Sequence, residues 1–428
     1  MNDQLVRVNR DRLWDTLMRL AQIGSCHDAA TGLPGVRRLA LTDEDAQARR
    51  QVIAWMREAG LVVRIDRIGN VYGRRAGTGE DLPCVLMGSH IDTVATGGAF
   101  DGTLGVLGAI EVVRTLNDYG AATLRPIEVG FFTEEEGVRF GTDMLGSAVT
   151  AGRLTLDYAH KLTDDTGASV ADELVRTGFD GPEHERRPIP FAYIECHIEQ
   201  GPILAAAGVD VGIVIGVQSI SWQRLELRGA AGHAGTTPIE HRQDAGLAAA
   251  AVIVEIRRMC ESGQFGELRG TVGRLAFEPA QTNVIPAGAT MTVDMRVPDD
   301  DAMTAAEAHL AEFVAGLARG YGVTGSLERM AKTRVVRFSR DVQALLAATA
   351  DDLGLPYVKA MSGAGHDAQE IAAICPTAMV FVAGEHGGVS HTPREYSNPT
   401  ACGNGVDLLA NAILRLANQP EGSFLGGS

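Results

Sequence analysis

The sequence predicts an α/β protein in which a smaller α+β domain interrupts a larger one. Helix and strand patterns alternate over roughly the first two hundred residues and resume after about residue 334. Between them stands a run of β, α, β, β, α and β patterns. The chain has 428 residues, beyond the size at which a single core stops growing. We therefore place the larger domain at 1–212 and 332–428 and the insert at 213–331.

The larger domain begins with amphipathic helices and apolar strands. Two apolar faces recur at helical spacing, Leu13, Leu17, Leu20 and Ala21 in the first and Ile53, Ala54, Met56 and Ala59 in the second. Apolar runs predict strands at 62–65, 84–89 and 127–132, and a helix follows at 104–116. Helices and strands that alternate in this way predict a sheet covered by helices.

The insert has the element order of a ferredoxin-like sheet with helices on one face. Alternating or apolar segments predict strands at 214–227, 271–277 and 289–296 and near Ser326. Helices are predicted at 245–259 and 302–319. A sheet of this kind buries one face against both helices.

Composition narrows the possible partners and compartment. The formal charge is −16, from 38 basic and 54 acidic residues, which argues against nucleic acid or an anionic membrane as a partner. Six cysteines without a Cys-x-x-Cys pair favour reduced thiols in the cytoplasm. The opening residues 1–7 lack the apolar run of a signal peptide, and 245–254 is too short to span a bilayer.

Five metal-type side chains each lie in a short, distinctive fragment: His90, Asp101, Glu136, His197 and His391. Several of the fragments follow apolar runs, and strand ends are where α/β sheets place chemistry. Any one fragment alone is more often a capped turn or a buried structural group. Together they indicate a metallohydrolase. Imidazole and carboxylate suit zinc and also other first-row ions, so the ligands leave the metal open.

A carboxylate between two cations offsets their repulsion, and Asp101 can take that place. His90 and His197 can then serve one ion, while Glu136 and His391 serve the other. Two-metal sites hold their ions roughly 3.5–4 Å apart and activate water for attack.

Two further acids can assist such a site. Glu135, next to Glu136, is a candidate for the base that takes the proton of the attacking water. Asp92, two residues after His90, can accept the other ring N–H of that histidine and set its tautomer. The alternative for the run Glu134–Glu136 is a solvated turn after a strand.

Taken in order, these fragments resemble the M20 family of metal-dependent amidohydrolases, and within it the hydantoinase/carbamoylase branch. The resemblance extends from 9–14 to 395–396. The branch is indicated by five segments, 134–140, 197–201, 232–238, 281–286 and 362–368. The resemblance implies a zinc-peptidase-like catalytic domain with a mixed sheet flanked by helices, and an insert that serves as lid and dimerisation domain.

The resemblance also implies roles for individual residues. Metal ligation falls to His90, Asp101, Glu136, His197 and His391, the catalytic roles to Glu135, His233 and Asp92, and substrate contacts to Gln200, His233, Asn283, Arg296, Ser362 and Gly363. His233 suits a neutral donor to the carbonyl oxygen, and Arg296 a bidentate partner of a substrate carboxylate. The alternatives are a turn histidine at 233, a loop amide at 283, a strand-end cap at 200, and an Arg296 paired with Asp294 or Asp299.

The activity implied is hydrolysis of the ureido C–N bond of N-carbamoyl-L-amino acids, which yields amino acid, CO2 and ammonia. Allantoate or ureidoglycolate amidohydrolysis is the alternative; an N-acyl amino acid deacylase or peptidase, or a non-catalytic binding protein, is more remote. Two divalent ions are expected, zinc first, with manganese, cobalt or nickel as alternatives. The resemblance also implies a homodimer formed through the insert. His233, Asn283 and Arg296 then act either in their own subunit or in the site of the partner subunit. Glu385 and His386, before His391, either shape the pocket or are merely exposed.

Overall fold

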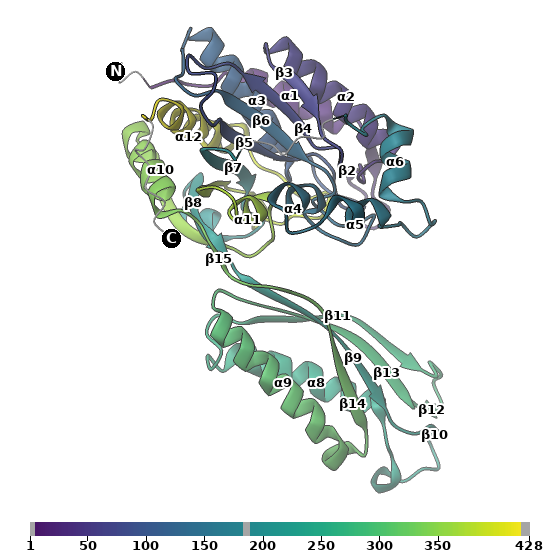
Figure 1. The fold of residues 1–428 in the computed structure, drawn as a ribbon. Coiled ribbons are helices and arrows are strands. Elements are labelled where there is room, and N and C mark those ends of the chain that lie inside the picture. Colours follow the sequence, from purple (N-terminus) through teal and green to yellow (C-terminus); the bar gives the residue numbers. More distant parts are fainter. Residues whose placement is uncertain (1–4, 183–188, 421–428) are drawn as a thin grey trace. The chain divides into compact units, whose positions relative to one another are not determined.

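The computed structural model describes residues 5–182 and 189–420, so the first four residues of the N-terminal stretch lie outside it. The chain divides into two compact units (Figure 1). The larger consists of Met1–Gly216 and Arg337–Ser428, and the smaller of Val217–Val336. The boundaries predicted from the sequence fall a few residues earlier at both junctions.

Within the described residues, the larger unit is built on a nine-stranded mixed sheet. Its order is β15-β8-β17-β7-β5-β6-β4-β3, and β16 pairs with β8. The strands are β3 (Val62–Ile65), β4 (Val71–Arg75), β5 (Val85–His90), β6 (Ile127–Phe132), β7 (Ala192–Ile198), β8 (Val211–Val217), β15 (Val336–Arg337), β16 (Tyr357–Ser362) and β17 (Thr377–Val382). The four central strands β17, β7, β5 and β6 run parallel. A separate hairpin joins β1 (Ser25–His27) to β2 (Pro34–Val36).

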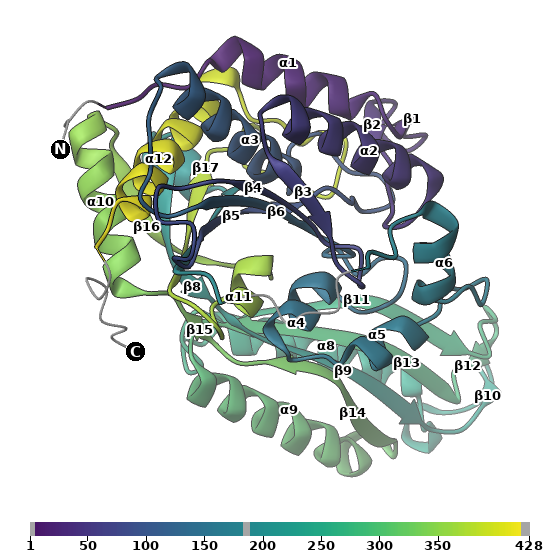
Figure 2. The same ribbon diagram turned by 45° about the horizontal axis from the view of Figure 1, so that its top comes forward.

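Helices cover both faces of this sheet, which confirms the predicted fold class (Figure 2). On one side α3 (Thr103–Asp118) and α12 (Pro399–Ala417) pack on the parallel strands, and on the other α4 (Leu145–Ala151) and α11 (Asp367–Ile371) do so. The remaining helices are α1 (Arg10–Ala21), α2 (Asp43–Glu58), α5 (Leu156–Lys161), α6 (Val170–Thr177), α7 (Ile203–Ala207) and α10 (Arg340–Leu353). Because both faces are covered, every residue of β5, β6, β7 and β17 is buried.

The smaller unit is a four-stranded antiparallel sheet with two helices. Its order is β11-β13-β9-β14, with β9 (Ser219–Arg228), β11 (Arg269–Glu278), β13 (Gly288–Val297), β14 (Thr324–Thr333), α8 (Ala245–Glu261) and α9 (Asp300–Tyr321). A short pair, β10 (Gly232–His233) with β12 (Val284–Ile285), and the 3-10 turn η1 (Ile239–His241) complete it. Alternate residues of β9 and β13 pack on α8 and α9 to form its core.

The single strand predicted at 214–227 is wrong in one respect. Those residues form the end of β8 in the large sheet and then β9 in the insert, with a break at Gln218. Apolar alternation continues across the break, so the sequence pattern does not reveal that the chain changes sheets. Over the described residues, no helix has both the length and the apolar character required to traverse a bilayer.

Candidate metal centre

The carboxyl ends of the four parallel strands bring the predicted ligands to one edge of the sheet. His90 ends β5, and His197 is the penultimate residue of β7. Glu136 lies in the turn after β6, and His391 in the segment between β17 and α12. Asp101 lies immediately before α3, in the turn that Gly102 closes with a φ of 61°. The sheet topology therefore assembles residues that are far apart in the sequence.

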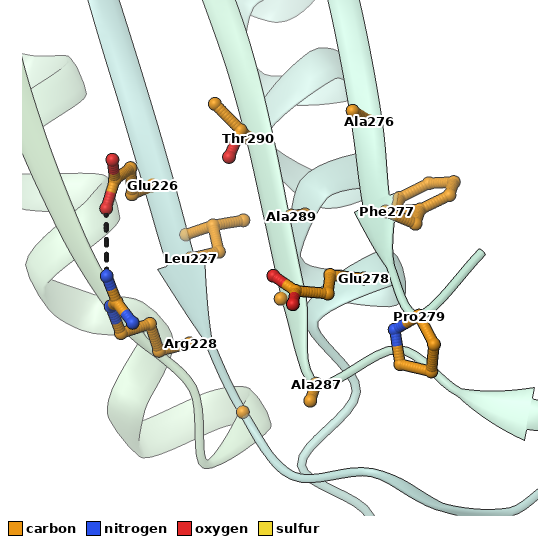
Figure 3. Close-up of a pocket in the computed structure, with 12 residues that line it drawn as sticks. Glu226, Leu227, Arg228, Ala276, Phe277, Glu278, Pro279, Ala287, Ala289 and Thr290 are labelled. Atoms are coloured by element: carbon orange, nitrogen blue, oxygen red, sulfur yellow. Dashed lines mark hydrogen bonds and ion pairs between the residues drawn. The ribbon is translucent and has the colours of Figure 1, made fainter.

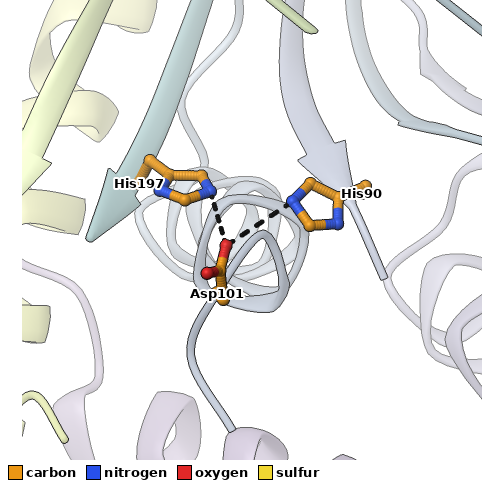
Figure 4. A group of neighbouring side chains, drawn as sticks. All are labelled: His90, Asp101 and His197. Atoms are coloured by element: carbon orange, nitrogen blue, oxygen red, sulfur yellow. Dashed lines mark ion pairs between the residues drawn. The ribbon is translucent and has the colours of Figure 1, made fainter. Parts of the chain in front are cut away.

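Asp101 lies between two groups of ligands. Its Oδ1 is 3.7 Å from His90 Nε2 and 3.1 Å from His197 Nε2 (Figure 4). Its Oδ2 is 3.5 Å from His391 Nε2, which is in turn 3.4 Å from Glu136 Oε2. In each group of three the ligand atoms lie within 4.8 Å of one another. One carboxylate thus presents a different oxygen to each group, the arrangement that a bridging ligand requires.

The ionisation of the site fits divalent cations. Burial and the neighbouring acids Asp367, Glu136 and Asp92 raise the pKa of Glu135 well above its usual range. Burial lowers the pKa of His90 to about 4, so its imidazole is neutral and able to act as a ligand. Although burial opposes it, the hydrogen bond and charge of Asp101 raise the pKa of His197 to about 9, so a cation would have to displace a proton there. Buried carboxylates and imidazoles are the donors that first-row ions take.

The two histidines of the first group are oriented by backbone carbonyls. His90 Nδ1 is 3.0 Å from the Asp92 carbonyl oxygen, and His197 Nδ1 is 2.8 Å from that of Ile198. Nδ1–H is therefore the donor in both rings, and each Nε2 lies toward Asp101. In His197 the backbone N–H of Gly102 also donates to Nε2, at 3.1 Å.

The predicted role of the Asp92 side chain needs correction. Its Oδ1 is 3.8 Å from His90 Nδ1, too far for a hydrogen bond, because the backbone carbonyl occupies that position. The carboxylate instead accepts from the backbone N–H of Glu135 at 3.3 Å and of Glu136 at 3.2 Å. Asp92 therefore holds the acidic turn in place, and its carbonyl sets the tautomer of His90.

In the acidic run after β6, Glu134 and Glu135 are buried and Glu136 is half-buried, so the alternative of a solvated turn is wrong. Glu134 adopts a left-handed φ of 55° and accepts from the backbone N–H of Arg139 and Phe140 at 2.9 and 2.7 Å. Glu135 is only 8% exposed, and its Oε2 lies 3.5 Å from His90 Nε2. Glu135 belongs to neither group of ligands around Asp101 in the described residues.

Three neighbours hold the Asp101 carboxylate and its backbone. Gln200 Nε2 donates to Asp101 Oδ2 at 2.8 Å, and the Ser390 hydroxyl does so at 2.5 Å. Glu395 accepts from the backbone N–H of Phe100 and Asp101, and its Oε2 lies 2.7 Å from Ser390 Oγ. Gln200 was predicted as a substrate contact, but its amide N–H is directed at Asp101. Glu395 was missed, although it closes the fragment 390–395 that contains His391.

His197 also belongs to a second set of buried polar residues, of which sequence reasoning missed Glu195 and His366. Glu195, His197 and His366 form a further group with ligand atoms within 4.8 Å. Glu195 accepts from Ser89 at 2.6 Å and from the backbone N–H of Ala368 at 2.8 Å. His366 and Asp367 lie within the segment 362–368 that resembles the family, in which only Ser362 and Gly363 were predicted as site residues. Ser362 is buried and hydrogen-bonded to His366 at 2.9 Å, whereas Gly363 is half-buried.

The insert holds the other three predicted residues. His233 is exposed in β10, and its Nδ1 accepts from the backbone N–H of Gly235 at 3.0 Å and of Thr236 at 3.2 Å. Asn283 is exposed beside it, and its carbonyl accepts from Ala234. Arg296 forms the ion pair with Asp294 that was the alternative at this position, with contacts of 2.9–3.1 Å.

The insert also contains a hollow of about 870 Å³ at the end of β9, β11 and β13 (Figure 3). Glu226, Arg228, Phe277 and Glu278 are among its lining residues, and Glu226 pairs with Arg228 at 3.1 Å. None of the predicted site residues lines this hollow.

Comparison with known proteins agrees with this arrangement. Residues 86–415 match the family described as peptidase family M20/M25/M40. The chain is 39% identical to an N-carbamoyl-L-amino-acid amidohydrolase of Rhizobium meliloti over 97% of this chain and 98% of that protein. It is 35% identical to a ureidoglycolate hydrolase of Oryza sativa over 90% of this chain and 81% of that protein.

A solved structure extends the likeness to the fold. The crystal structure of an amidase of the hydantoinase/carbamoylase family from Burkholderia multivorans superposes with a TM-score of 0.91 at 39% identity, covering 97% of this chain and 99% of that one. The family match spans well over half of the chain, and the likeness to the curated relatives is nearly full-length. The chain belongs to the metal-dependent peptidase family M20/M25/M40, in its hydantoinase/carbamoylase branch.

Proposed function

We propose that the protein hydrolyses the ureido C–N bond of N-carbamoyl-L-amino acids and releases the amino acid, CO2 and ammonia. The observation that carries this proposal is the Asp101 arrangement, with one oxygen toward each ligand group and Glu135 beside it. The substrate class rests on the 39% identity to a relative with that name. An active amidohydrolase needs both a cation site and a proton carrier, and this arrangement supplies candidates for each.

We assign two divalent cations to the site. His90, Asp101 and His197 would hold one, and Asp101, Glu136 and His391 the other. When bound, such ions polarise the scissile carbonyl and make water more acidic. Zinc is our first expectation, because neutral imidazole and carboxylate are its common ligands; manganese, cobalt and nickel accept the same donors.

Glu135 is our general base. Its carboxylate would take a proton from the attacking water and deliver it to the leaving nitrogen. Burial beside other acids raises its pKa, and cations bound close by would lower it again, so that the carboxylate is ionised before attack. Asp92, through the backbone N–H of Glu135, would keep that carboxylate in position.

Substrate recognition would draw on Gln200, the Ser362–Gly363 turn and three residues of the insert. Since His233 Nδ1 accepts two backbone N–H groups, its proton lies on Nε2, and the ring is a neutral donor suited to a developing oxyanion. Asn283, beside it, offers a polar amide. Arg296 is our candidate for the substrate carboxylate, because a guanidinium offers two parallel donors. In this role it would exchange part of its pairing with Asp294 for the substrate.

Ureidoglycolate is the second candidate substrate, and allantoate is chemically close to it. The 35% identity to the rice ureidoglycolate hydrolase favours this alternative. All three compounds place a ureido group near a carboxylate, so the same residues would serve each.

We further propose that two copies of the chain pair through the insert. The neighbouring elements α8 and β11 expose five large apolar side chains, Leu247, Ile253, Val254, Leu275 and Phe277. Exposed apolar groups collected on adjacent elements are typical of interaction surfaces. Light scattering on the protein as it elutes from a size-exclusion column should give the mass of two chains. The Val254→Asp variant should give the mass of one chain.

We place the protein in the cytoplasm. Each of the six cysteines is a free thiol. Free thiols without any disulfide are the usual state in a reducing compartment. Cell fractionation tests this location.

The first experiment measures ammonia release from the purified protein, stripped of metal and reloaded in turn with zinc, manganese, cobalt and nickel. The panel contains N-carbamoyl-L- and D-amino acids, N-carbamoyl-β-alanine, allantoate, ureidoglycolate and the matching N-acetyl amino acids. We expect ammonia from the L-carbamoyl compounds. A preference for allantoate or ureidoglycolate would replace the substrate, and no ammonia from a protein holding two metals would refute the substrate class.

A further inference from the structure

His366 is a buried histidine that the proposed function leaves unused. It immediately precedes α11, and its side chain contacts the rings of His197 and Phe381. The ring centroid is 4.5 Å from that of His197, in an edge-to-face arrangement, and 5.8 Å from that of Phe381. The ring thus packs directly on a proposed metal ligand.

The hydrogen bonds of Ser362 determine which nitrogen of His366 carries the proton. Ser362 Oγ lies 2.8 Å from the Ala364 carbonyl oxygen, which can only accept, so the hydroxyl proton is used there. The same Oγ accepts from the Ala364 N–H at 3.1 Å and lies 2.9 Å from His366 Nε2. His366 Nε2 must therefore be the donor in the last contact.

The other nitrogen of the ring is then an acceptor. His366 Nδ1 is buried and has no hydrogen-bond partner among the described residues. The ring of His366 therefore makes one hydrogen bond, to Ser362, and one close aromatic contact, with His197. These two contacts join the Ser362–Gly363 turn, which we assigned to substrate, to a residue that we assigned to metal.

We infer that His366 is a positioning residue that acts through two separable parts: its Nε2–H holds the substrate turn, and its ring holds His197. This inference rests on the proposed function, since it deepens the roles of Ser362 and His197. It predicts that the two parts can be removed one at a time. Loss of the donor would affect substrate binding, and loss of the ring would affect metal binding.

Two substitutions of His366 separate the parts. His366→Phe keeps a ring of similar shape and loses the donor, whereas His366→Gln places an amide donor near the former Nε2 and loses the ring. We expect His366→Phe to raise KM about fivefold, the value of one neutral hydrogen bond, with metal affinity unchanged. We expect His366→Gln to keep KM within about twofold while metal affinity falls about tenfold, as for other groups that orient a ligand.

Ser362→Ala and Thr349→Val serve as companions. Ser362→Ala removes the same hydrogen bond together with the two that Ser362 makes to the Ala364 backbone, so its KM should rise at least as much as that of His366→Phe, and the double variant should be no worse than Ser362→Ala. Thr349→Val removes a buried hydroxyl of α10 that donates to the Leu345 carbonyl, and it should change neither quantity. Metal affinity is measured by competition with a chelator, and KM with the substrate of the panel that is turned over fastest.

Several outcomes would overturn the inference. If both substitutions of His366 change KM and metal affinity alike, the residue is only a structural support. If His366→Phe loses metal, Nδ1 is itself a ligand. Should His366→Phe fail to fold, an unchanged KM in Ser362→Ala would reject the role of the turn. A wild-type protein inactive on the whole panel would reject the proposed function instead, and the chelator competition would still test the contact with His197.

Discussion

Replacing Glu135 by glutamine isolates proton transfer from metal binding. The side chain keeps its length and shape but can no longer accept a proton. Glu135 Oε2 lies 3.5 Å from His90 Nε2, whereas the ligand groups around Asp101 are complete without it. Its backbone N–H, held by the Asp92 carboxylate, is unaffected by the substitution. The variant should therefore retain both cations and lose rate.

The size of the loss follows from the role. Removing a general acid–base group costs roughly 10²–10⁴ in rate. At 1.36 kcal/mol per tenfold change, this corresponds to about 2.7–5.4 kcal/mol in the activation free energy. The loss should appear in kcat, with KM nearly constant, because the proton is transferred only in the chemical step.

The adjacent residue supplies a matched control. Glu136→Gln makes the same chemical change one position along, at a carboxylate 3.4 Å from His391 Nε2. It should weaken the binding of one ion. Elemental analysis after dialysis and ammonia release with a saturating substrate measure the two effects separately. If Glu135→Gln lost metal and Glu136→Gln kept it, the roles of the two acids would have to be exchanged, and a full rate in Glu135→Gln would refute the base assignment.

Three further predictions follow from the described contacts. Gly102→Ala would place a methyl group against His90 Nε2, closer than van der Waals contact allows. Metal affinity, measured by competition with a chelator, should therefore fall at least about tenfold. An unchanged affinity would show that His90 is not held as described. Arg296→Lys keeps charge but not the paired donors used with Asp294, so KM should rise about tenfold for carboxylate substrates only, and an equal effect on neutral amides would sink the carboxylate assignment. Burial and Asp101 raise the pKa of Glu395 to about 7, above its unfolded value of 4.5. Between these two pH values the Glu395 carboxyl is protonated in the folded state and ionised in the unfolded state. The metal-free protein should therefore lose stability as the pH rises from about 4.5 through 7. The midpoint of thermal unfolding should fall by about 5 °C or more over this pH range in the presence of chelator, and by much less with metal bound. A midpoint that does not change with pH in chelator would contradict this prediction.

The parallel part of the fold could be predicted because its strands are buried on both faces. The run at 127–132 coincides with β6, the run at 84–89 lies one residue from β5, and the insert has the predicted order of strands and helices. Strand β7 was not predicted as an element, since Glu195 and His197 interrupt its apolar pattern. One of the two, His197, is a proposed metal ligand, and the other, Glu195, belongs to the group of possible ligands that His197 forms with His366. A polar residue flanked on both sides by apolar residues in a strand is therefore a signal for a site. A search for regular apolar periodicity alone rejects such a strand and misses this signal.

The family and the five ligand candidates were accessible from sequence, because each ligand stands in a fragment of unusual composition. The roles of the supporting residues were less accessible. Glu395 and Glu195 are single polar residues with partners that are distant in the chain, such as Ala368 for Glu195, and His366 packs on the distant ring of His197. Their importance comes from burial and from hydrogen bonds across the sheet edge. Sequence spacing contains neither quantity.

Backbone conformation explains why the atoms that make each contact could not be predicted from the residue types. At Asp92 the carbonyl accepts from His90, and the carboxylate turns to the N–H groups of the acidic run. At Gln200 a φ of 57° accompanies an amide that donates to Asp101. His391 has a similar φ of 58°. Left-handed conformations are costly for side chains other than glycine, so their presence at two residues of one centre indicates that the surrounding contacts impose them. Residue type is thus selected by chemistry and can be recognised in a sequence, whereas the atom that performs the task is selected by backbone geometry and needs the structure.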